Sequence, residues 1–510
     1  MSQSPSFARR RFLQGMGALS VCGTGAPLAL SLAGMGEAAA QSSSGSDYKA
    51  LVCIFLYGGN DSFNTVLTTD ATSWGNYVAT RNQAPSSIAL LQAGTAPDTA
   101  ATPGSPAWLG GVRPIYPSNQ PSGSSFALHP LLVNSQSLFN TQKKLAVVAN
   151  MGPLEEPLTK AEYLQKSKRV PKKLFSHNDQ QNTWLAMQPE GAVNGWGGKL
   201  ADLFAADNSQ SLFTAISASG NSVWLSGSTT RQYQISRKGV QKFGVRPADY
   251  ATGQVFGSTA VAEALRHIAS NERTTINRHV FAKDLAANNQ RALAAEGVIE
   301  THLPSDTLAP FGPSSRLQYQ SINGGLVESD LAKQLQMVAR LISMGQSLSL
   351  RRQVFFVSLS GFDSHDNQNT KHSELMAVLD HALGYFQSTI DSLGLANKVT
   401  TFTASEFGRT FTSNGDGTDH GWGAHHFVMG GAVQGGKIFG QVPQLGRMNT
   451  NDPMFDSSPD QLRNGVLLPT TSVDQFAGVL GNWFGVSQTN LNTIFPNLSR
   501  FGSGTNLSFV

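Results

Sequence analysis

The sequence is poor in cysteine and in charge. Only 2 cysteines occur in 510 residues, and charged residues make up 14% of the chain, against roughly 25% in an average soluble domain. So few cysteines exclude a disulfide-stapled fold. The 37 basic and 33 acidic residues give no excess of positive charge of the kind that nucleic-acid-binding proteins carry. With 40% hydrophobic residues, 51 glycines and 23 prolines, the composition excludes disordered chains and multi-span membrane proteins and indicates a loop-rich globular protein.

The first 40 residues have the pattern of an export signal. Arginines occupy positions 9–11, an apolar stretch runs from about Met16 to Met35, and three alanines precede Gln41. This pattern is typical of a twin-arginine signal peptide with a small-residue cleavage site. We therefore predict a signal peptide over residues 1–40, a polar tether over residues 41–47, and a periplasmic or secreted protein. The twin-arginine export machinery is then a partner, and no stable membrane span remains after cleavage.

Cleavage would change both the charge and the cysteine content. Loss of residues 1–40 would remove three arginines and Glu37, which lowers the formal charge from +4 to +2. Cys22 would be lost as well, so Cys53 would be the only cysteine and could form no intramolecular disulfide. Cys53 lies within the apolar run LVCIFL, which predicts a buried small hydrophobic residue rather than a nucleophile.

Four short apolar runs read as buried strands. They cover residues 51–56, 145–150, 354–359 and 399–404, and each is followed by a turn that bears glycine, aspartate or glutamate. Between the last two, apolar residues from Leu375 to Leu393 recur at three- and four-residue spacing, which predicts an amphipathic helix. Strand, helix and strand together make a βαβ unit.

Further helices are predicted over residues 329–344 and 473–483, and residues 259–297 also read as helical. Ser472 and Gln475 have the spacing of a capping box at the start of one of them. Residues 84–125 are rich in Pro, Gly, Ser and Thr, and are interpreted as a loop insertion. We predict one α/β domain over residues 48–510, with a mostly parallel sheet flanked by helices and large loop insertions.

Polar residues with chemical potential follow these apolar runs. Asp61 comes after the first, Asp363 and His365 after the third, and Glu406 and Arg409 after the fourth. The carboxyl ends of parallel strands are where α/β proteins build their sites. Six of the eleven histidines lie between positions 365 and 426, His420 among them. Carboxylates and imidazoles suit zinc, manganese and similar ions, so the sequence favours a metal site.

Four segments together resemble a known family. They are GGNDSFN, GFDSHDNQ, SEFGRT and GTDHGWGAHHFVMGG, and the C-terminal segment SVDQFAGVLGNWFGV agrees with them. In order and spacing they resemble the exported bacterial family called domain of unknown function 1501. That family is similar to the alkaline phosphatase and sulfatase superfamily, which implies a fold of that kind with one or two divalent metal ions, of zinc, manganese, calcium or iron.

The resemblance implies metal ligands at five positions. They are Asp61, Asp363, His365, Glu406 and His420. The superfamily's phosphatases space the pair that corresponds to Asp363 and His365 four residues apart, whereas this chain spaces it by two. A histidine is expected after Glu406, and Phe407 stands there instead.

The same resemblance implies a nucleophile at the start of a helix. Ser176 is the local candidate, with His177 as an acid, base or ligand and Arg409 to steady an anionic oxygen. Ser176 also has the character of a plain helix N-cap, and Arg409 that of a local ion-pair partner of a carboxylate. The sulfatase motif C-x-P-S-R does not occur in the chain, which argues against a formylglycine mechanism.

We therefore predict an exported, metal-dependent hydrolase of phosphate or sulfate esters, whose substrate is a small-molecule or glycan ester rather than a nucleic acid. Two other functions remain open. One is a metal-free serine esterase, which GGND and Asp363-Ser364-His365 superficially suggest. The other is a non-catalytic secreted binding or assembly protein with a structural metal.

Overall fold

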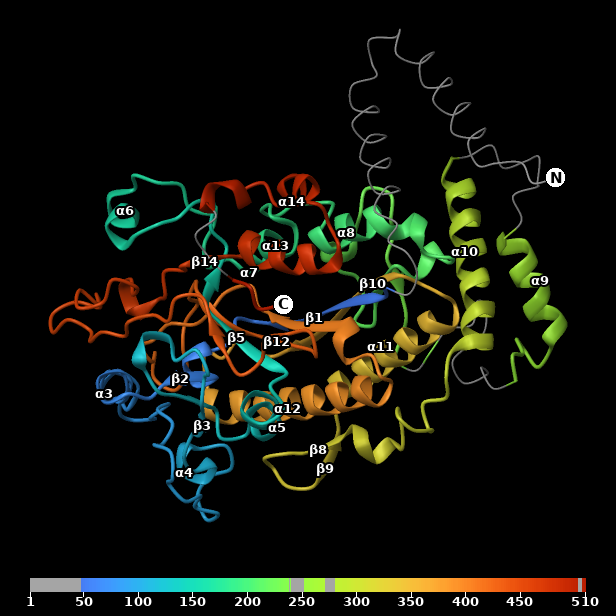
Figure 1. Cartoon of the computed structure of the whole chain (residues 1–510). Coiled ribbons are helices and arrows are strands. Elements are labelled where there is room, and N and C mark those ends of the chain that lie inside the picture. Colours follow the sequence, from blue (N-terminus) through green and yellow to red (C-terminus); the bar gives the residue numbers. More distant parts are fainter. Residues whose placement is uncertain (1–46, 238, 240–251, 271–279, 503–506) are drawn as a thin grey trace, which may run out of the picture. The chain divides into compact units, whose positions relative to one another are not determined.

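The computed structural model describes residues 47–237, 239, 252–270, 280–502 and 507–510 (Figure 1). The signal peptide predicted over residues 1–40 and nearly all of the tether predicted over 41–47 lie outside the described residues. The chain from Tyr48 to Val510 forms one unit. Within the described residues, no helix is both long and apolar enough to cross a membrane.

A nine-stranded sheet occupies the centre of this unit. Its main path runs in the order β13, β5, β12, β11, β1, β10, β6 and β7, and β14 pairs with β5. Within the described part of this sheet, β12 is antiparallel to both its neighbours and the other pairings are parallel. The bounds are β1 Lys49–Tyr57, β5 Leu145–Gly152, β6 Ala215–Ser217, β7 Tyr233–Gln234, β10 Arg352–Ser360, β11 Val399–Ala404, β12 Ala424–Met429, β13 Ile438–Phe439 and β14 Thr471–Ser472.

Strand β1 shows why the sheet is buried on both faces. Its apolar side chains alternate between two cores, because successive residues of a strand point to opposite faces. Val52 and Ile54 belong to the core that contains helices α11 (Asp330–Ser347) and α12 (Gln368–Ser392). Cys53 and Phe55 belong to the core that contains α8 (Trp196–Phe204) and α13 (Val473–Phe484). The sheet is therefore flanked by helices on both faces (Figure 1), and the predicted mostly parallel α/β fold is confirmed.

The predicted secondary structure agrees with the elements observed. All four apolar runs form strands, and Cys53 is fully buried within β1, where burial raises the pKa of its thiol. The predicted strand–helix–strand unit is β10, α12 and β11, but β1 lies between the two strands in the sheet. The residues that begin α13 form the predicted capping box: Ser472 accepts from the amide of Gln475, whose side chain accepts from the amide of Ser472.

The remaining elements extend this frame. Helices α9 and α10 lie within the region 259–297 that was predicted to be helical or just beyond it, and residues 271–279 between them are outside the described residues. In the segment 84–125, β3 joins a separate three-stranded sheet in the order β2-β4-β3. The bounds are β2 Val66–Thr68, β3 Arg113–Ile115, β4 Phe126–Leu128, β8 Gln318–Gln320, β9 Leu326–Glu328, α3 Ala71–Arg81, α4 Pro106–Leu109, α5 Val133–Asn140, α6 Lys160–Gln165, α7 His177–Ala186, α9 Thr259–Ser270, α10 Val280–His302 and α14 Gln488–Ile494.

The three central strands end together at one edge of the sheet. Because β11, β1 and β10 are parallel neighbours, the segments after Ala404, Tyr57 and Ser360 leave the sheet at the same edge. At Gly58 the backbones of the segments after β1 and β10 approach each other closely. It has φ +119, and a Cβ at this position would lie 2.2 Å from the amide nitrogen of Asp363. Only glycine tolerates both this conformation and this contact.

We expect Gly58→Ala to destabilise the protein by more than the left-handed backbone alone would. Gly394→Ala is the matched control, because Gly394 has φ +70 and nothing within 4 Å of the Cβ position. The control should lose about 1–2 kcal/mol. Gly58→Ala should lose a further ~1–3 kcal/mol because the methyl group overlaps the backbone of Asp363. Unfolding midpoints in denaturant measure both losses, and equal midpoints would contradict this account of Gly58.

Candidate metal centre

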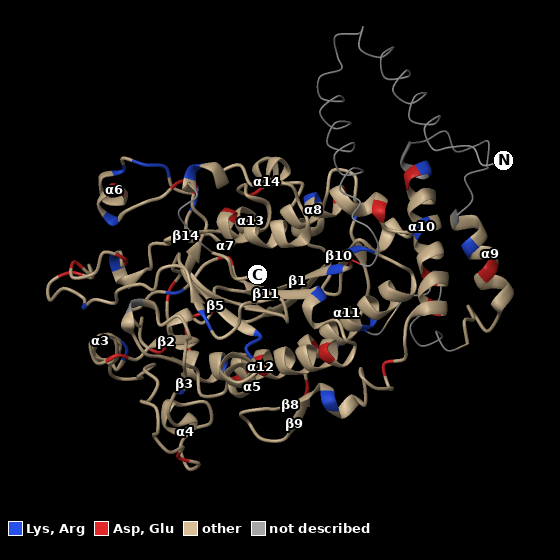
Figure 2. Ribbon diagram, in the orientation of Figure 1, with Lys and Arg blue, Asp and Glu red and all other residues tan. Residues whose placement is uncertain are grey.

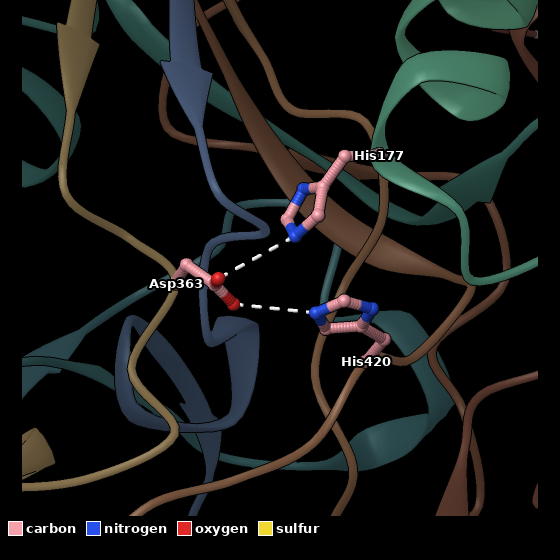
Figure 3. A group of neighbouring side chains, drawn as sticks. All are labelled: His177, Asp363 and His420. Atoms are coloured by element: carbon pink, nitrogen blue, oxygen red, sulfur yellow. Dashed lines mark hydrogen bonds and ion pairs between the residues drawn. The ribbon is translucent and has the colours of Figure 1, made fainter.

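Three side chains from different parts of the chain converge at this edge of the sheet. Asp363 follows β10, His420 lies between β11 and β12, and His177 is the first residue of α7. One ligand atom from each lies within 4.8 Å of the others. Figure 3 shows both imidazoles directed at the carboxylate of Asp363. The structure therefore brings together a carboxylate and two imidazoles that the sequence analysis singled out.

His365 joins this group as a third imidazole. Its Nε2 lies 3.1 Å from Oδ1 of Asp363 and 3.0 Å from Nε2 of His420. Nε2 of His420 lies 3.2 Å from the same Oδ1, and Nε2 of His177 lies 3.5 Å from Oδ2. Three histidines thus turn the same ring nitrogen toward one carboxylate.

The opposite nitrogen of each imidazole meets an oxygen. Nδ1 of His177 lies 2.9 Å from Oε1 of Glu406, and Nδ1 of His365 lies 3.2 Å from Oδ1 of Asp419. Nδ1 of His420 lies 2.7 Å from the carbonyl oxygen of Phe175. An ionised carboxylate and a carbonyl can only accept, so each Nδ1 is placed to donate its hydrogen, and in the neutral form of each ring the lone pair is then on Nε2. This is the arrangement in which histidines bind metals.

Asp363 is held by a buried guanidinium. Arg409 donates from Nη1 to Oδ1 of Asp363 at 2.9 Å, and it also donates to the carbonyl oxygens of Gly58 and Thr418. Burial alone would raise the pKa of Asp363, but the hydrogen bond and charge of Arg409 outweigh it and hold that pKa below its ordinary value. Arg409 is fully buried, so the structure makes it a positioning residue for Asp363 rather than a group that contacts an anionic substrate oxygen.

The pKa values of His177 and His420 are shifted in opposite directions. The hydrogen bond that His177 makes to Glu406 raises the pKa of His177, and the charges of Glu406 and Asp363 act in the same direction. Burial lowers the pKa of His420, although its contact with the carbonyl of Phe175 acts in the other direction. His420 is therefore stabilised in the neutral form that a metal requires, and His177 has the greater tendency to hold a proton when no cation is bound.

Glu406 is placed behind the imidazoles rather than among the ligands. It is fully buried, and its Oε1 accepts from the amide of Gly58 at 2.9 Å and from Gln181 at 3.0 Å as well as facing His177. These contacts use Oε1, while Oε2 accepts from the hydroxyl of Ser405 at 3.4 Å. The structure thus places Glu406 where it orients His177, and the ligand role that the resemblance implied for it stays a prediction.

Asp61 belongs to a separate buried ion pair. Arg81 contacts both of its carboxylate oxygens, at 2.5 and 3.0 Å, and Gln368 donates to Oδ2 at 2.6 Å. Burial would raise the pKa of Asp61, but Arg81 lowers it below the ordinary value. The structure therefore places Asp61 in a buried ion pair with Arg81, and the ligand role that the resemblance implied for it stays a prediction.

Ser176 and Phe407 also take structural positions. Ser176 precedes α7, and its hydroxyl donates to Oδ2 of Asp179 at 2.9 Å instead of capping a backbone amide of the helix. The structure gives it no contact with the imidazole group. The ring of Phe407 stacks on His420 at 4.6 Å and lies 4.9 Å from the ring of His177. Phe407 thus stands where a histidine was expected, and its apolar ring packs against the imidazoles of His420 and His177.

Comparison with known proteins identifies the family. Residues 48–495 match the family described as "Protein of unknown function (DUF1501)". The chain belongs to the DUF1501 family. No curated protein matches the sequence. Among solved structures, the PsFucS1 sulfatase from Pseudoalteromonas sp. is similar over 90% of this chain and 71% of its own, with 11% identity and a TM-score of 0.29. At that TM-score the likeness supports no conclusion about fold or chemistry.

Several residues of this DUF1501 protein's site escaped the sequence analysis. Asp419 stands beside His420 in a segment that was singled out, but no periodicity distinguishes it as the partner of His365. Phe175 contributes through its backbone carbonyl, which no residue pattern reveals. Arg81 ends helix α3, 20 positions from Asp61, in a segment without any chemical motif.

We expect the Arg81–Asp61 pair to matter for stability and not for cation binding. Arg81→Met should destabilise this DUF1501 protein by about 3–5 kcal/mol, because it leaves Asp61 buried and uncompensated. The double variant Asp61→Asn/Arg81→Met should recover most of that loss, since both charges are gone. Denaturation midpoints measure the recovery, and elemental analysis of the double variant should show unchanged metal content. A double variant that folds but binds no metal would return Asp61 to the ligand set.

Proposed function

We propose that this DUF1501 protein is an exported, metal-dependent hydrolase that acts on phosphate or sulfate esters. The observation that carries the proposal is the convergence of three Nε2 atoms on Asp363, each imidazole held from behind by an oxygen. The Nε2 atoms of His365 and His420 lie 3.0 Å apart, and in the neutral tautomers with hydrogen on Nδ1 their lone pairs repel one another unless a proton or a metal cation lies between them. His177, His365, His420 and Asp363 would hold one such cation.

The donor set supports a transition metal or zinc. Three imidazole nitrogens and one carboxylate oxygen match the ligands of zinc, iron and manganese, whereas calcium takes six to eight oxygens. Tetrahedral Zn–N bonds of about 2.0–2.1 Å separate ligand atoms by roughly 3.3–3.4 Å. The separations of 3.1–3.5 Å between the carboxylate oxygens of Asp363 and the three Nε2 atoms are close to that spacing. We therefore favour a single ion over two, because Asp61 already pairs with Arg81.

The exposure of the site supports catalysis over a closed structural metal. The side chains of Asp363 and His365 are 45% and 44% exposed, and that of His177 is 31% exposed. Structural zinc sites are closed by protein, while catalytic sites leave a position for substrate. A divalent ion here would supply Lewis-acid polarisation of an ester oxygen. The protein residues would position it, Arg409 through Asp363 and Glu406 through His177.

Two parts of this proposal rest on the sequence. Export by the twin-arginine machinery rests on residues 1–40, and the choice of phosphate or sulfate esters rests on the superfamily that the motifs resemble. The serine esterase alternative is disfavoured by the hydroxyls. Ser176 donates to Asp179 and Ser364 donates to Gln368, so neither is hydrogen-bonded to an imidazole.

We expect His177→Ala/His420→Ala to lose at least about 100-fold in affinity for Zn²⁺ or Mn²⁺, because it removes two of four ligands. Turnover of aryl phosphate and aryl sulfate esters should fall with it. His302→Ala/Asp306→Asn is the matched control, because both residues are exposed and lie outside this group. Elemental analysis and an ester panel on untagged protein give the two readings. Metal bound without turnover of any ester would favour the non-catalytic secreted protein.

Asp419→Asn tests the oxygen behind His365. We expect a loss of about 10-fold in metal affinity with the fold retained, because Asp419 fixes the ring orientation and the tautomer of His365. Asp416→Asn is the control: Asp416 is exposed in the same loop and accepts from the amide of Asn367 at 3.0 Å. Equal affinities of the two variants would contradict the role given to Asp419.

A further inference from the structure

A strongly basic segment leads directly to the candidate metal centre. Residues 166–173, with the sequence KSKRVPKK, contain five basic and no acidic residues. Their formal charge of +5 exceeds the net +4 of the entire chain, so the rest of the chain has a net charge of −1. Figure 2 shows basic residues around α6 and along the chain that follows it. We call residues 166–173 the basic segment.

Most of this charge is available to a partner. Lys166, Arg169 and Lys172 are exposed, and no acidic side chain among the described residues pairs with them. Lys168 pairs with Glu162 at 3.0 Å, and Lys173 lies 3.4 Å from Asp179. Three cations of the basic segment are therefore unpaired.

Backbone contacts fix the basic segment to the metal centre. Gln180 of α7 donates to the carbonyl oxygens of Lys172 and Lys173, at 3.0 and 3.3 Å. The same helix begins with His177. Phe175 lies between Lys173 and His177, and its carbonyl accepts from His420. Lys173 and Lys172 thus lie four and five residues before His177, and their carbonyls contact the helix that His177 begins. This proximity relates the charge to the chemistry of the site.

Phe175 adds an apolar surface at the same place. It is 37% exposed and has φ +73, a conformation that costs a non-glycine residue about 1–2 kcal/mol. That conformation accompanies the hydrogen bond between its carbonyl and His420. An exposed aromatic ring beside a catalytic group can stack on the apolar face of a sugar.

We propose that the substrate is an acidic polysaccharide that carries sulfate or phosphate esters, bound by the basic segment and by Phe175. This proposal rests on the hydrolase function given above and names its substrate class. One ester group would lie at the metal centre, and the charged groups of neighbouring sugars would meet Lys172, Arg169 and Lys166. Charged clefts of this kind concentrate polyanions and speed their association.

Two other polyanionic partners fit less well. Single-stranded nucleic acids are bound through a series of stacking side chains, and the basic segment contains no aromatic residue. Anionic membranes are bound by amphipathic helices with an apolar face, whereas α6 ends at Gln165 and the basic segment that follows is not helical. An irregular, charged segment with an exposed aromatic ring beside it suits a linear polysaccharide better than either.

The test compares charge removal at two places. The first variant is Lys166→Ser/Arg169→Ser/Lys172→Ser in the basic segment. The control is Lys283→Ser/Arg351→Ser/Lys398→Ser, which removes the same charge in α10 and at the amino ends of β10 and β11, the edge of the sheet opposite the metal centre. Binding of heparin and of polyphosphate to untagged, metal-loaded protein is measured by calorimetry at about 50 mM salt, where surface charges are weakly screened.

We expect the first variant to bind heparin about tenfold more weakly, which corresponds to three exposed charge contacts of ordinary strength. The control should bind as the wild type does and should turn over a small aryl ester normally. Wild-type affinity of the first variant for heparin would overturn the proposal. Preferential binding of the wild type to anionic vesicles, lost in the first variant, would also overturn it.

Phe175→Leu separates a sugar polymer from a plain phosphate polymer. It should weaken heparin binding about threefold and leave polyphosphate binding unchanged, because polyphosphate has no sugar face to stack. Equal loss for both polymers would reject the polysaccharide. Binding is read without turnover, so the two proposals can fail separately. Intact, charge-dependent heparin binding by a protein that turns over no ester would reject the hydrolase and keep the binding surface.

Discussion

The hydrogen bonds of one buried guanidinium hold the site together. Arg409 donates to the carbonyl of Gly58 after β1, to the carboxylate of Asp363 after β10, and to Thr418 in the loop that carries His420. These are three separate stretches of chain. Because Arg409 is fully buried, each of its donors needs an acceptor, and the acceptors must stay in place. The position of the Asp363 carboxylate is therefore fixed by the hydrogen bonds that the buried guanidinium of Arg409 requires.

A second buried cation stands beside the first with a different result. Arg81 contacts both oxygens of Asp61 and donates further to the carbonyls of Phe411 and Thr410. Pairs of this kind are costly to desolvate and costlier to break. Asp61 and Asp363 both follow central strands, yet one is neutralised by protein and the other stays 45% exposed. Asp61 receives two guanidinium donors and Asp363 receives one, and this difference leaves only Asp363 able to contact solvent or a ligand.

The sequence was sufficient for the strands and for most of the site, for a common physical reason. Apolar runs such as residues 51–56 and 399–404 can be buried only inside a sheet, and parallel strands deliver the residues after them to one edge. Asp363, His365 and His420 could be named on that basis. The roles of Asp61, Glu406 and Arg409 could not, because they depend on which partners reach them in space. Arg81 and the carbonyl of Phe175 have no local pattern at all.

The order of the strands also determines when the site can exist. Among the strands of the central sheet, β1 comes first in the chain, yet it lies between β10 and β11. The amide of Gly58 donates to the carboxylate of Glu406, which lies 348 positions further along the chain. Contacts between such distant residues form slowly, because the intervening chain must be closed into a loop before they are rewarded. A ribosome-bound fragment that ends before β11 would leave the edge of β1 that pairs with β11 unpaired and apolar. This architecture therefore commits the cell to keeping a nearly complete, unfolded chain from aggregating until synthesis has finished.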